Sequence, residues 1–541
     1  MREKSDSSRS EIIRAIRRTN YNLNIIPESI EGIVWPTSVM KVILARKAEN
    51  RLKKQIPFNY MATEFTPSED FKDYSLEHNE ELAMLVKFLK ENHNKLPVGL
   101  RFQLAVLIGG HWTCVDNVIT STGLAVFNLD SVMDFKARQF FQVYLVNLDK
   151  EGLLNAGYLY FVNVPSAGPF AKTPKEKVAN MIQTDWVSCG IFVVDHLSFL
   201  SRSNVFHHLK TALGESKYVT LGREDIPPAL AAIFRLSQSD LLLENLTRKQ
   251  KEPAVTRKGK RLSEVSYRDA REKGGKLLQE AKNYVENCGE EEFAKIFSHN
   301  LLEQLSKYVI HYSRPVNDLI EFVYDSLPHC KNLPDEAAIK LMEKLHGVVL
   351  LSELNDSQKI LAITELTISA LEHNNEVSSY RLLAGVLSYA VLNLHDNQQL
   401  FDFYMKILTG PLGQSLSNIT NSFFKTPTRF TPALLAHLEK AVKTQLLLNA
   451  AVDLENGHSE QFNLIYNLPG CLAFINKPRT FDTSETKSGK ILNALNELAG
   501  RQETNAIEPI KQKLEERKIE VLREFEFKRP ESASPVPTVR Q

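Results

Sequence analysis

Cysteine is scarce in this sequence, and long apolar runs are absent from it. The 541 residues include five cysteines, which show neither the close pairs of a zinc site nor the density of a disulfide scaffold. No run of about eighteen uncharged apolar residues occurs, so we expect no membrane span. The N-terminal residues MREKSDSSRSEIIRAIRR lack the apolar core of a Sec-type signal peptide. These absences together predict a protein of a reducing compartment such as the cytoplasm.

An excess of charge of either sign is also missing. Lysine and arginine number 66 and aspartate and glutamate 65, so the charge balance does not favour nucleic-acid binding. Hydrophobic residues make up 43% of the chain and charged residues 24%, which excludes a largely disordered protein. At this length we expect several domains.

Patterning divides the chain into five parts. We expect a helical extension (1–60), an α+β domain (61–245), a basic linker (246–264), an all-α region of one or more domains (265–525) and a disordered tail (526–541). The linker is interpreted from TRKQKEPAVTRKGKR, which is basic, contains proline and has few large apolar residues; a nuclear-import or anionic-surface role is the alternative. The all-α region follows from apolar residues at three- to four-residue spacing, interrupted by proline and glycine.

The α+β domain is predicted from short strand-like runs separated by turn residues. Gly109-Gly110 provides a turn between the first two runs. A helix is expected to begin at or just before Cys189, in the apolar stretch CGIFVVDHLSFL. The four expected strands are FQLAVLI (102–108), WTCVDNV (112–118), LAVFNLD (124–130) and YLYFVNV (158–164).

The segment QTDWVSCG has the residues of a thiol active centre. A thiol nucleophile needs a base, a group that holds the base and a donor for the oxyanion. Cys189 opens a helix, where unpaired backbone amides and the helix dipole favour the thiolate. Gln183 lies six residues earlier and carries an amide. We therefore predict Cys189 as the nucleophile and Gln183 as the oxyanion donor.

A base and its partner are found upstream, at the ends of two expected strands. His111 begins one strand, and Asp130 ends the next. In an antiparallel hairpin of suitable register, the end of the second strand returns beside the start of the first. Asp130 would then fix the tautomer of His111.

These residues resemble clan CE cysteine peptidases, the family of ubiquitin-like-protein proteases that includes SUMO proteases and bacterial deubiquitinases. GGHWTCVDNVITSTGLAVFNLDS followed by QTDWVSCGIFVVDHL matches the family's His-Trp pair, its Asp-Ser after the next strand, and its Gln, five residues, then Cys-Gly. The resemblance covers roughly residues 90–205. It implies a papain-like domain with a small mixed sheet and flanking helices. It also implies catalytic roles for His111, Asp130, Gln183 and Cys189.

The resemblance carries further implications for substrate and location. Trp112 matches the tryptophan that lines the narrow channel for the modifier's diglycine tail. The expected activity is cleavage of ubiquitin or a ubiquitin-like modifier from proteins, without a metal or cofactor. The family usually has Trp-Leu-x-Asp before a helix, whereas this chain has Trp35-Pro36-Thr37-Ser38, so the resemblance does not assign Trp35 to the channel. Because the clan includes injected bacterial effectors, secretion into a host cell by a non-Sec route and a host partner for the helical region are also expectations.

Two alternatives use the same residues differently. Acetyltransferases of the YopJ type resemble this order of His, carboxylate, Gln and Cys, and there the cysteine carries acetyl from acetyl-CoA. They typically have Glu as the acid and an inositol polyphosphate activator that needs a basic pocket, which the sequence does not identify. The second alternative is a non-catalytic adaptor, in which the α+β domain binds a modifier and the helical region binds a partner.

Rival residues of the same types are present near each predicted one. Cys114 is three residues along the strand from His111, so it should face the opposite side and belong to the core. His196 is two helical turns past Cys189, about 10 Å along the axis and beyond hydrogen-bond reach, which predicts a structural or exposed side chain. Asp130 is favoured because it ends a strand where the family places its acid. The rival carboxylates are Asp116, Asp134 and Asp185.

Overall fold

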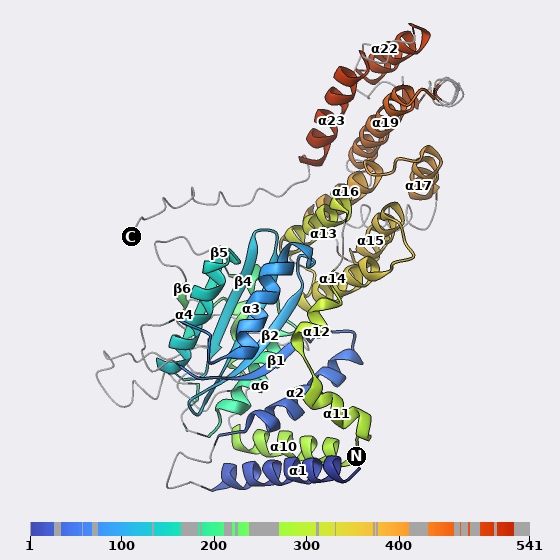
Figure 1. Cartoon of the computed structure of the whole chain (residues 1–541). Coiled ribbons are helices and arrows are strands. Elements are labelled where there is room, and N and C mark those ends of the chain that lie inside the picture. The colour runs from blue at the N-terminus through green and yellow to red at the C-terminus, as the bar shows by residue number, and fades with distance from the viewer. Residues whose placement is uncertain are drawn as a thin grey trace. The chain divides into compact units, whose positions relative to one another are not determined.

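The computed structural model is a mixed α+β structure, with 17 α-helices and one six-stranded sheet among the residues that it describes (Figure 1). It divides into two compact units, Met1–His311 and Tyr312–Glu531. The expected linker and C-terminal tail lie outside the described residues. The described residues are 2–25, 34–56, 58–67, 74–132, 135–163, 182–183, 185, 187–209, 219–221, 226–236, 270–309, 313–330, 332–371, 374, 377–409, 431–458, 462, 466, 474–475, 487–501 and 506–523.

The sheet of the first unit is mixed and its strands follow one another in chain order. Neighbours β2, β3 and β4 are antiparallel, whereas β1 with β2, β4 with β5 and β5 with β6 are parallel. The four strands expected from the sequence are confirmed as β2 to β5, and two outer strands are added. The strands are β1 (Tyr60–Phe65), β2 (Arg101–Ile108), β3 (His111–Thr120), β4 (Gly123–Asp130), β5 (Leu154–Asn163) and β6 (Val219–Leu221).

A glycine turn and the pairing of β3 with β4 position the ends of the central strands. Gly109 and Gly110 have φ values of 48° and 95°, in the left-handed region that glycine adopts most easily, and they allow β2 to turn into β3. Between β3 and β4 the pairing places Cys114 opposite Leu129. The end of β4 therefore returns to the start of β3, as the hairpin prediction requires.

Each face of the sheet is covered by helices. Helices α3 (Glu80–Asn92) and α4 (Phe135–Lys150) pack on one face through an apolar cluster that includes Leu104 and Val115. Side chains alternate along a strand, so Trp112 points to the other face. There helix α6 (Cys189–Leu200) packs on β3, and every residue of α6 is buried.

Five further helices, from both ends of the first unit, complete its packing, and two of them, α2 and α10, contact α6. The five are α1 (Arg2–Asn24), α2 (Thr37–Leu52), α10 (Ala270–Asn287), α11 (Glu290–Ser298) and α12 (Leu301–Ser306). Helix α10 packs on α1, α2 and α6. Two short segments complete this region: α7 (Val205–His208) and the 3₁₀ helix η3 (Pro228–Phe234).

Close contacts attach these later helices to the first unit. Arg9 of α1 donates from Nη1 to the carbonyl oxygens of Val285 and Cys288, each at 2.9 Å. A Cβ added to Gly274 would overlap the side chains of Ile191 and Leu23, so glycine allows α10 to approach both α6 and α1. The first unit thus extends to His311 and includes α10 to α12, which the sequence division placed in the all-α region starting at residue 265.

The second unit contains helices and no strand among its described residues. Its helices pack pairwise, for example α14 on α15 and α19 on α23. Its helices are α13 (Arg314–Ser326), α14 (Asp335–Leu350), α15 (Asp356–Leu371), α16 (Val377–Val391), α17 (Asn397–Thr409), α19 (Thr431–Glu455), α22 (Lys487–Arg501) and α23 (Glu508–Arg523). In the described part of the chain, no helix combines the length and apolar character needed to cross a bilayer.

Candidate active site

Cys189 is the first residue of α6, as the sequence predicted. The carbonyl oxygen of Ser188 accepts the N–H groups of Ile191 (2.9 Å) and Phe192 (3.1 Å), so the helix begins directly at the cysteine. Cys189 is 3% exposed, which leaves its thiol almost shielded from water. At a helix start the first backbone amides have no intrahelical partner, and they favour negative charge. The position therefore suits a thiolate.

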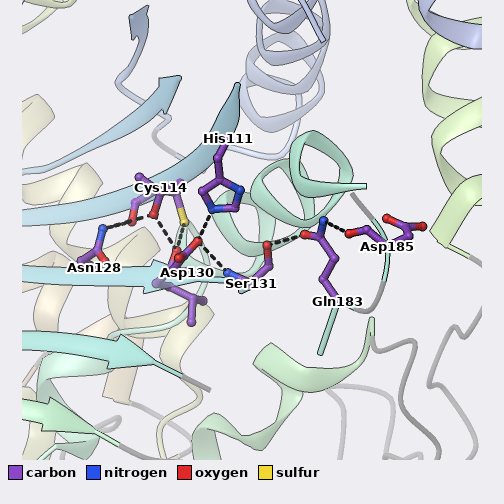
Figure 2. Close-up of polar contacts among 9 residues, drawn as sticks. His111, Cys114, Asn128, Asp130, Ser131, Gln183 and Asp185 are labelled. Atoms are coloured by element: carbon purple, nitrogen blue, oxygen red, sulfur yellow. Dashed lines mark hydrogen bonds and ion pairs between the residues drawn. The ribbon is translucent and has the colours of Figure 1, made fainter. Parts of the chain in front are cut away.

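His111 lies between Cys189 and a buried carboxylate. Its Nε2 is 2.6 Å from Oδ1 of Asp130, which is fully buried (Figure 2). Burial by itself opposes protonation of His111. The charge of Asp130 and its hydrogen bond, together with the hydrogen bond to Cys189, nevertheless hold the pKa of His111 well above its ordinary value. The arrangement therefore favours an imidazolium, which can pair with a thiolate.

Gln183 is brought to the same site from the loop before α6. It is 1% exposed. Its Oε1 accepts the Ser131 hydroxyl at 2.6 Å, and its Nε2 donates to the carbonyl oxygen of Asp185 at 2.7 Å (Figure 2). A side-chain amide has two N–H groups, and one of them is used here. The second N–H can serve a substrate oxyanion, because the first fixes the orientation of the amide.

Asp185 organises the segment immediately before the nucleophile. Its Oδ1 accepts the backbone N–H groups of Val187 (3.1 Å) and Ser188 (2.9 Å), and its Oδ2 accepts the Ser188 hydroxyl at 2.8 Å. Arg271 of α10 forms an ion pair with the same carboxylate at 3.4 Å. Asp185 is therefore an anchor for the loop, whereas the carboxylate beside His111 is Asp130.

Hydrogen bonds join these groups in one series. Asp130 Oδ1 also accepts the N–H of Ser131 at 2.9 Å, and Ser131 leads through its hydroxyl to Gln183 and then to Asp185 (Figure 2). The series links the start of β3, the end of β4 and the loop before α6. The structure thus brings His111, Asp130, Gln183 and Cys189 into one site.

Sequence reasoning gave no role to Ser131 and treated Asp185 only as a rival acid. A signal for Asp185 was present, because an aspartate before a helix often accepts the backbone N–H groups of the residues two and three positions after it. Ser131 had a weaker signal, as the residue after Asp130. Its contact with Gln183 crosses 52 residues and depends on the tertiary fold.

Two tryptophans near the site, Trp35 and Trp112, are buried. Trp112, expected to line a substrate channel, is fully buried, and its Nε1 donates to the carbonyl oxygen of Trp35 at 2.9 Å. A Cβ added to Gly190 would lie 2.9 Å from Cδ2 of Trp35, so glycine after the nucleophile makes room for this ring. Trp35, which the sequence did not assign, therefore packs beside Cys189. In this structure Trp112 supports that packing and has no exposed surface.

Three of the other rival residues, Cys114, His196 and Asp116, are buried and have structural surroundings. Cys114 is fully buried with Sγ 3.3 Å from the carbonyl oxygen of Leu129, and burial raises the pKa of its thiol well above the ordinary value. Burial lowers the pKa of His196 to about 4, so this side chain is structural and neutral. Asp116 is buried between Arg101 and Gln103. Asp134 lies outside the described residues.

Within the described ranges, no three His, Cys, Asp or Glu side chains gather in a way that could hold a metal ion. Comparison with known proteins adds no identification: no family model matches the chain, and no curated protein is significantly similar to it in sequence.

Proposed function

We propose that this protein is a cysteine isopeptidase that removes ubiquitin or a ubiquitin-like modifier from other proteins. We also propose that its α+β part has the papain-like fold of clan CE. One observation supports the activity above all: a cysteine at a helix start, a histidine bonded to a buried carboxylate and an oriented glutamine amide occupy one site. The resemblance in order and spacing supports the substrate class.

The first chemical step uses His111 and Cys189 as an ion pair. The sulfur attacks the carbonyl carbon of the modifier's C-terminal glycine, forming a C–S bond while the carbonyl oxygen becomes an oxyanion. Gln183 Nε2 and a backbone amide near Cys189 donate hydrogen bonds to that oxygen. His111 then gives its proton to the departing amine, and a thioester remains.

The second step releases the modifier. A water molecule loses a proton to His111 and attacks the thioester carbonyl, which breaks the C–S bond and regenerates the thiolate. Asp130 stabilises the imidazolium at both steps. The second, helical unit is proposed to choose or locate substrates, including host proteins, through contacts outside this site.

The test is reaction of the purified protein with a panel of ubiquitin and ubiquitin-like probes that carry C-terminal electrophiles. We expect one modifier to form a covalent adduct that Cys189→Ala abolishes. An acetyl-CoA consumption assay is run on the same samples. Acetyl transfer without an adduct would replace the peptidase proposal with the acetyltransferase alternative, and modifier binding without either reaction would favour the adaptor alternative.

A further inference from the structure

Ser131 follows the catalytic acid at the end of β4 and is buried between two groups of the site. It is 2% exposed. Its backbone N–H donates to Asp130 Oδ1 at 2.9 Å, and its hydroxyl donates to Gln183 Oε1 at 2.6 Å (Figure 2). The main chain of Ser131 therefore contacts the acid, while its side chain contacts the oxyanion donor. A change of the side chain alone alters only the second contact.

The far end of the Gln183 amide determines the direction of its bond with Ser131. That end faces the carbonyl oxygen of Asp185 at 2.7 Å, and a carbonyl oxygen can only accept. The nitrogen of the amide must therefore face Asp185, which leaves Oε1 facing Ser131. Because Oε1 is also only an acceptor, the serine hydroxyl must give its single proton to it.

Burial makes this hydroxyl difficult to replace. Gln183 is 1% exposed, so bulk water has little access to Oε1 if the hydroxyl is removed. A buried acceptor without a donor is unfavourable, and the amide would turn toward another donor. Such a turn would move the second N–H of Gln183 away from the position of the oxyanion.

The same bond strengthens the donor as well as orienting it. A proton held on the amide oxygen draws electron density from the nitrogen, and successive hydrogen bonds polarise one another, most strongly where water is excluded. The hydroxyl of Ser131, the amide of Gln183 and the oxyanion would form such a series. Its benefit increases as negative charge develops on the carbonyl oxygen, so it favours the transition state over the bound substrate.

We propose that Ser131 is a positioning residue, whose hydroxyl orients and polarises Gln183 for the oxyanion. The inference rests on the proposed acyl transfer to Cys189, but it holds for any acyl group that the cysteine accepts. Ser131 acts through Gln183, because both of its hydrogen bonds go to protein groups.

The test compares two reactions of full-length Ser131→Ala. We expect kcat for a modifier reporter to fall roughly 30-fold with little change in KM, which is less than the loss from removing the oxyanion donor itself. Alkylation of Cys189 by iodoacetamide forms no oxyanion. Its rate and pH profile should match those of the wild type, because the backbone N–H of residue 131 still holds Asp130. An equal loss in both reactions would show a structural role and overturn the proposal.

A double variant shows whether the effect passes through Gln183. Ser131→Ala/Gln183→Ala should be no slower than Gln183→Ala alone, because the hydroxyl has no other route to the oxyanion. Losses that multiply would overturn the proposal. The matched control is Ser201→Ala, since the buried Ser201 hydroxyl also makes one bond, to the carbonyl oxygen of Ser198 at 3.1 Å, just after α6. It should react like the wild type in both assays.

Two further measurements separate this inference from the isopeptidase proposal. If no modifier is cleaved, acylation of Cys189 by p-nitrophenyl acetate, which also forms an oxyanion, replaces the reporter. Nuclear magnetic resonance of protein labelled with ¹⁵N-glutamine needs no activity, and the Gln183 side-chain signals are assigned by their loss in Gln183→Ala. They should shift and broaden in Ser131→Ala and stay in place in Ser201→Ala. Unchanged Gln183 signals in Ser131→Ala would overturn the inference whatever the substrate.

Discussion

The two ends of helix α6 differ in how their polar groups are matched. At the start, Asp130, Ser131, Gln183 and Asp185 each meet a partner of complementary character, so the groups around Cys189 are fixed before any substrate arrives. Near the end, Asp195 pairs with Arg235 and Lys273 in a cavity that four further basic side chains also line. The matched end is suited to chemistry, because preorganised donors need no rearrangement in the transition state. The other end takes no part in the proposed chemistry, and the ion pairs of Asp195 with Arg235 and Lys273 attach α6 to the segment after η3 and to α10.

Removal of the nucleophile should have the largest effect at the matched end. We expect Cys189→Ala to lower turnover of a modifier reporter by roughly 10⁵-fold or more and to abolish adduct formation. Cys288→Ala, which alters a buried thiol at the end of α10, is the control and should react normally. A Cys189→Ala protein that still formed the adduct would contradict the assigned nucleophile.

Truncation separates the first unit, which contains both ends of helix α6, from the rest of the chain. Helix α10 supplies a cation to each end of α6, Arg271 to Asp185 and Lys273 to Asp195. A fragment 1–311 should therefore fold and cleave the reporter, whereas 1–264 should lose cooperative unfolding, because it lacks the helices that pack on α1, α2 and α6. Circular dichroism melting and reporter assays measure both fragments. A folded, active 1–264 fragment would show that α10 is dispensable.

Asp130→Asn tests the ion pair at the matched end. We expect kcat/KM to fall by roughly 10³-fold, because the neutral amide no longer stabilises the imidazolium. Alkylation of Cys189 by iodoacetamide should require a higher pH, since the thiolate loses its charged partner. An unchanged pH profile of alkylation would be inconsistent with a His111–Cys189 ion pair.

The Asp130→Asn variant also tests how the charge of His111 contributes to the free energy of unfolding. The folded-state pKa of His111 is raised, so its contribution to stability is fully present below the ordinary histidine value and is lost as pH rises through the folded value. The free energy of unfolding of the wild type should exceed that of Asp130→Asn most at low pH. Denaturant titrations from pH 5.5 to 9 should show this difference shrink.

Gln183→Ala should have a smaller effect, confined to steps that form an oxyanion. We expect kcat for the reporter to fall about 10²- to 10³-fold. Iodoacetamide alkylation forms no oxyanion, so its rate should stay near that of the wild type. An equal loss in both reactions would mean that Gln183 acts by supporting the fold.

Substitution of Asp185 should have the smallest effect on turnover, because this residue positions the loop before α6 and contacts no reacting atom. Asp185→Ala removes the acceptor for two backbone N–H groups and a hydroxyl, and roughly tenfold loss of kcat with little change in KM is expected. Asp185→Asn keeps one oxygen acceptor and should recover part of that loss. Recovery by asparagine, measured beside the melting temperature, distinguishes positioning from a general loss of stability.

Sequence by itself determined the local parts of this protein. The alternating apolar strands, the Gly109-Gly110 turn and the helix that opens at Cys189 follow from neighbouring residues, as does the approach of Asp130 to His111 within one hairpin. These features depend on the spacing of apolar residues, on turn residues and on the closure of short loops. All three are visible in the linear sequence.

Only the tertiary structure decided the contacts that join distant segments. The Ser131–Gln183 bond, the packing of Trp35 on Gly190 and the attachment of α10 to the catalytic unit cross tens to hundreds of residues. The basic cavity is the extreme case, because its cations come from segments between residues 47 and 273 in a chain whose charges nearly cancel. The charge of each side chain can be read from the sequence, whereas the grouping of these side chains around one cavity depends on packing.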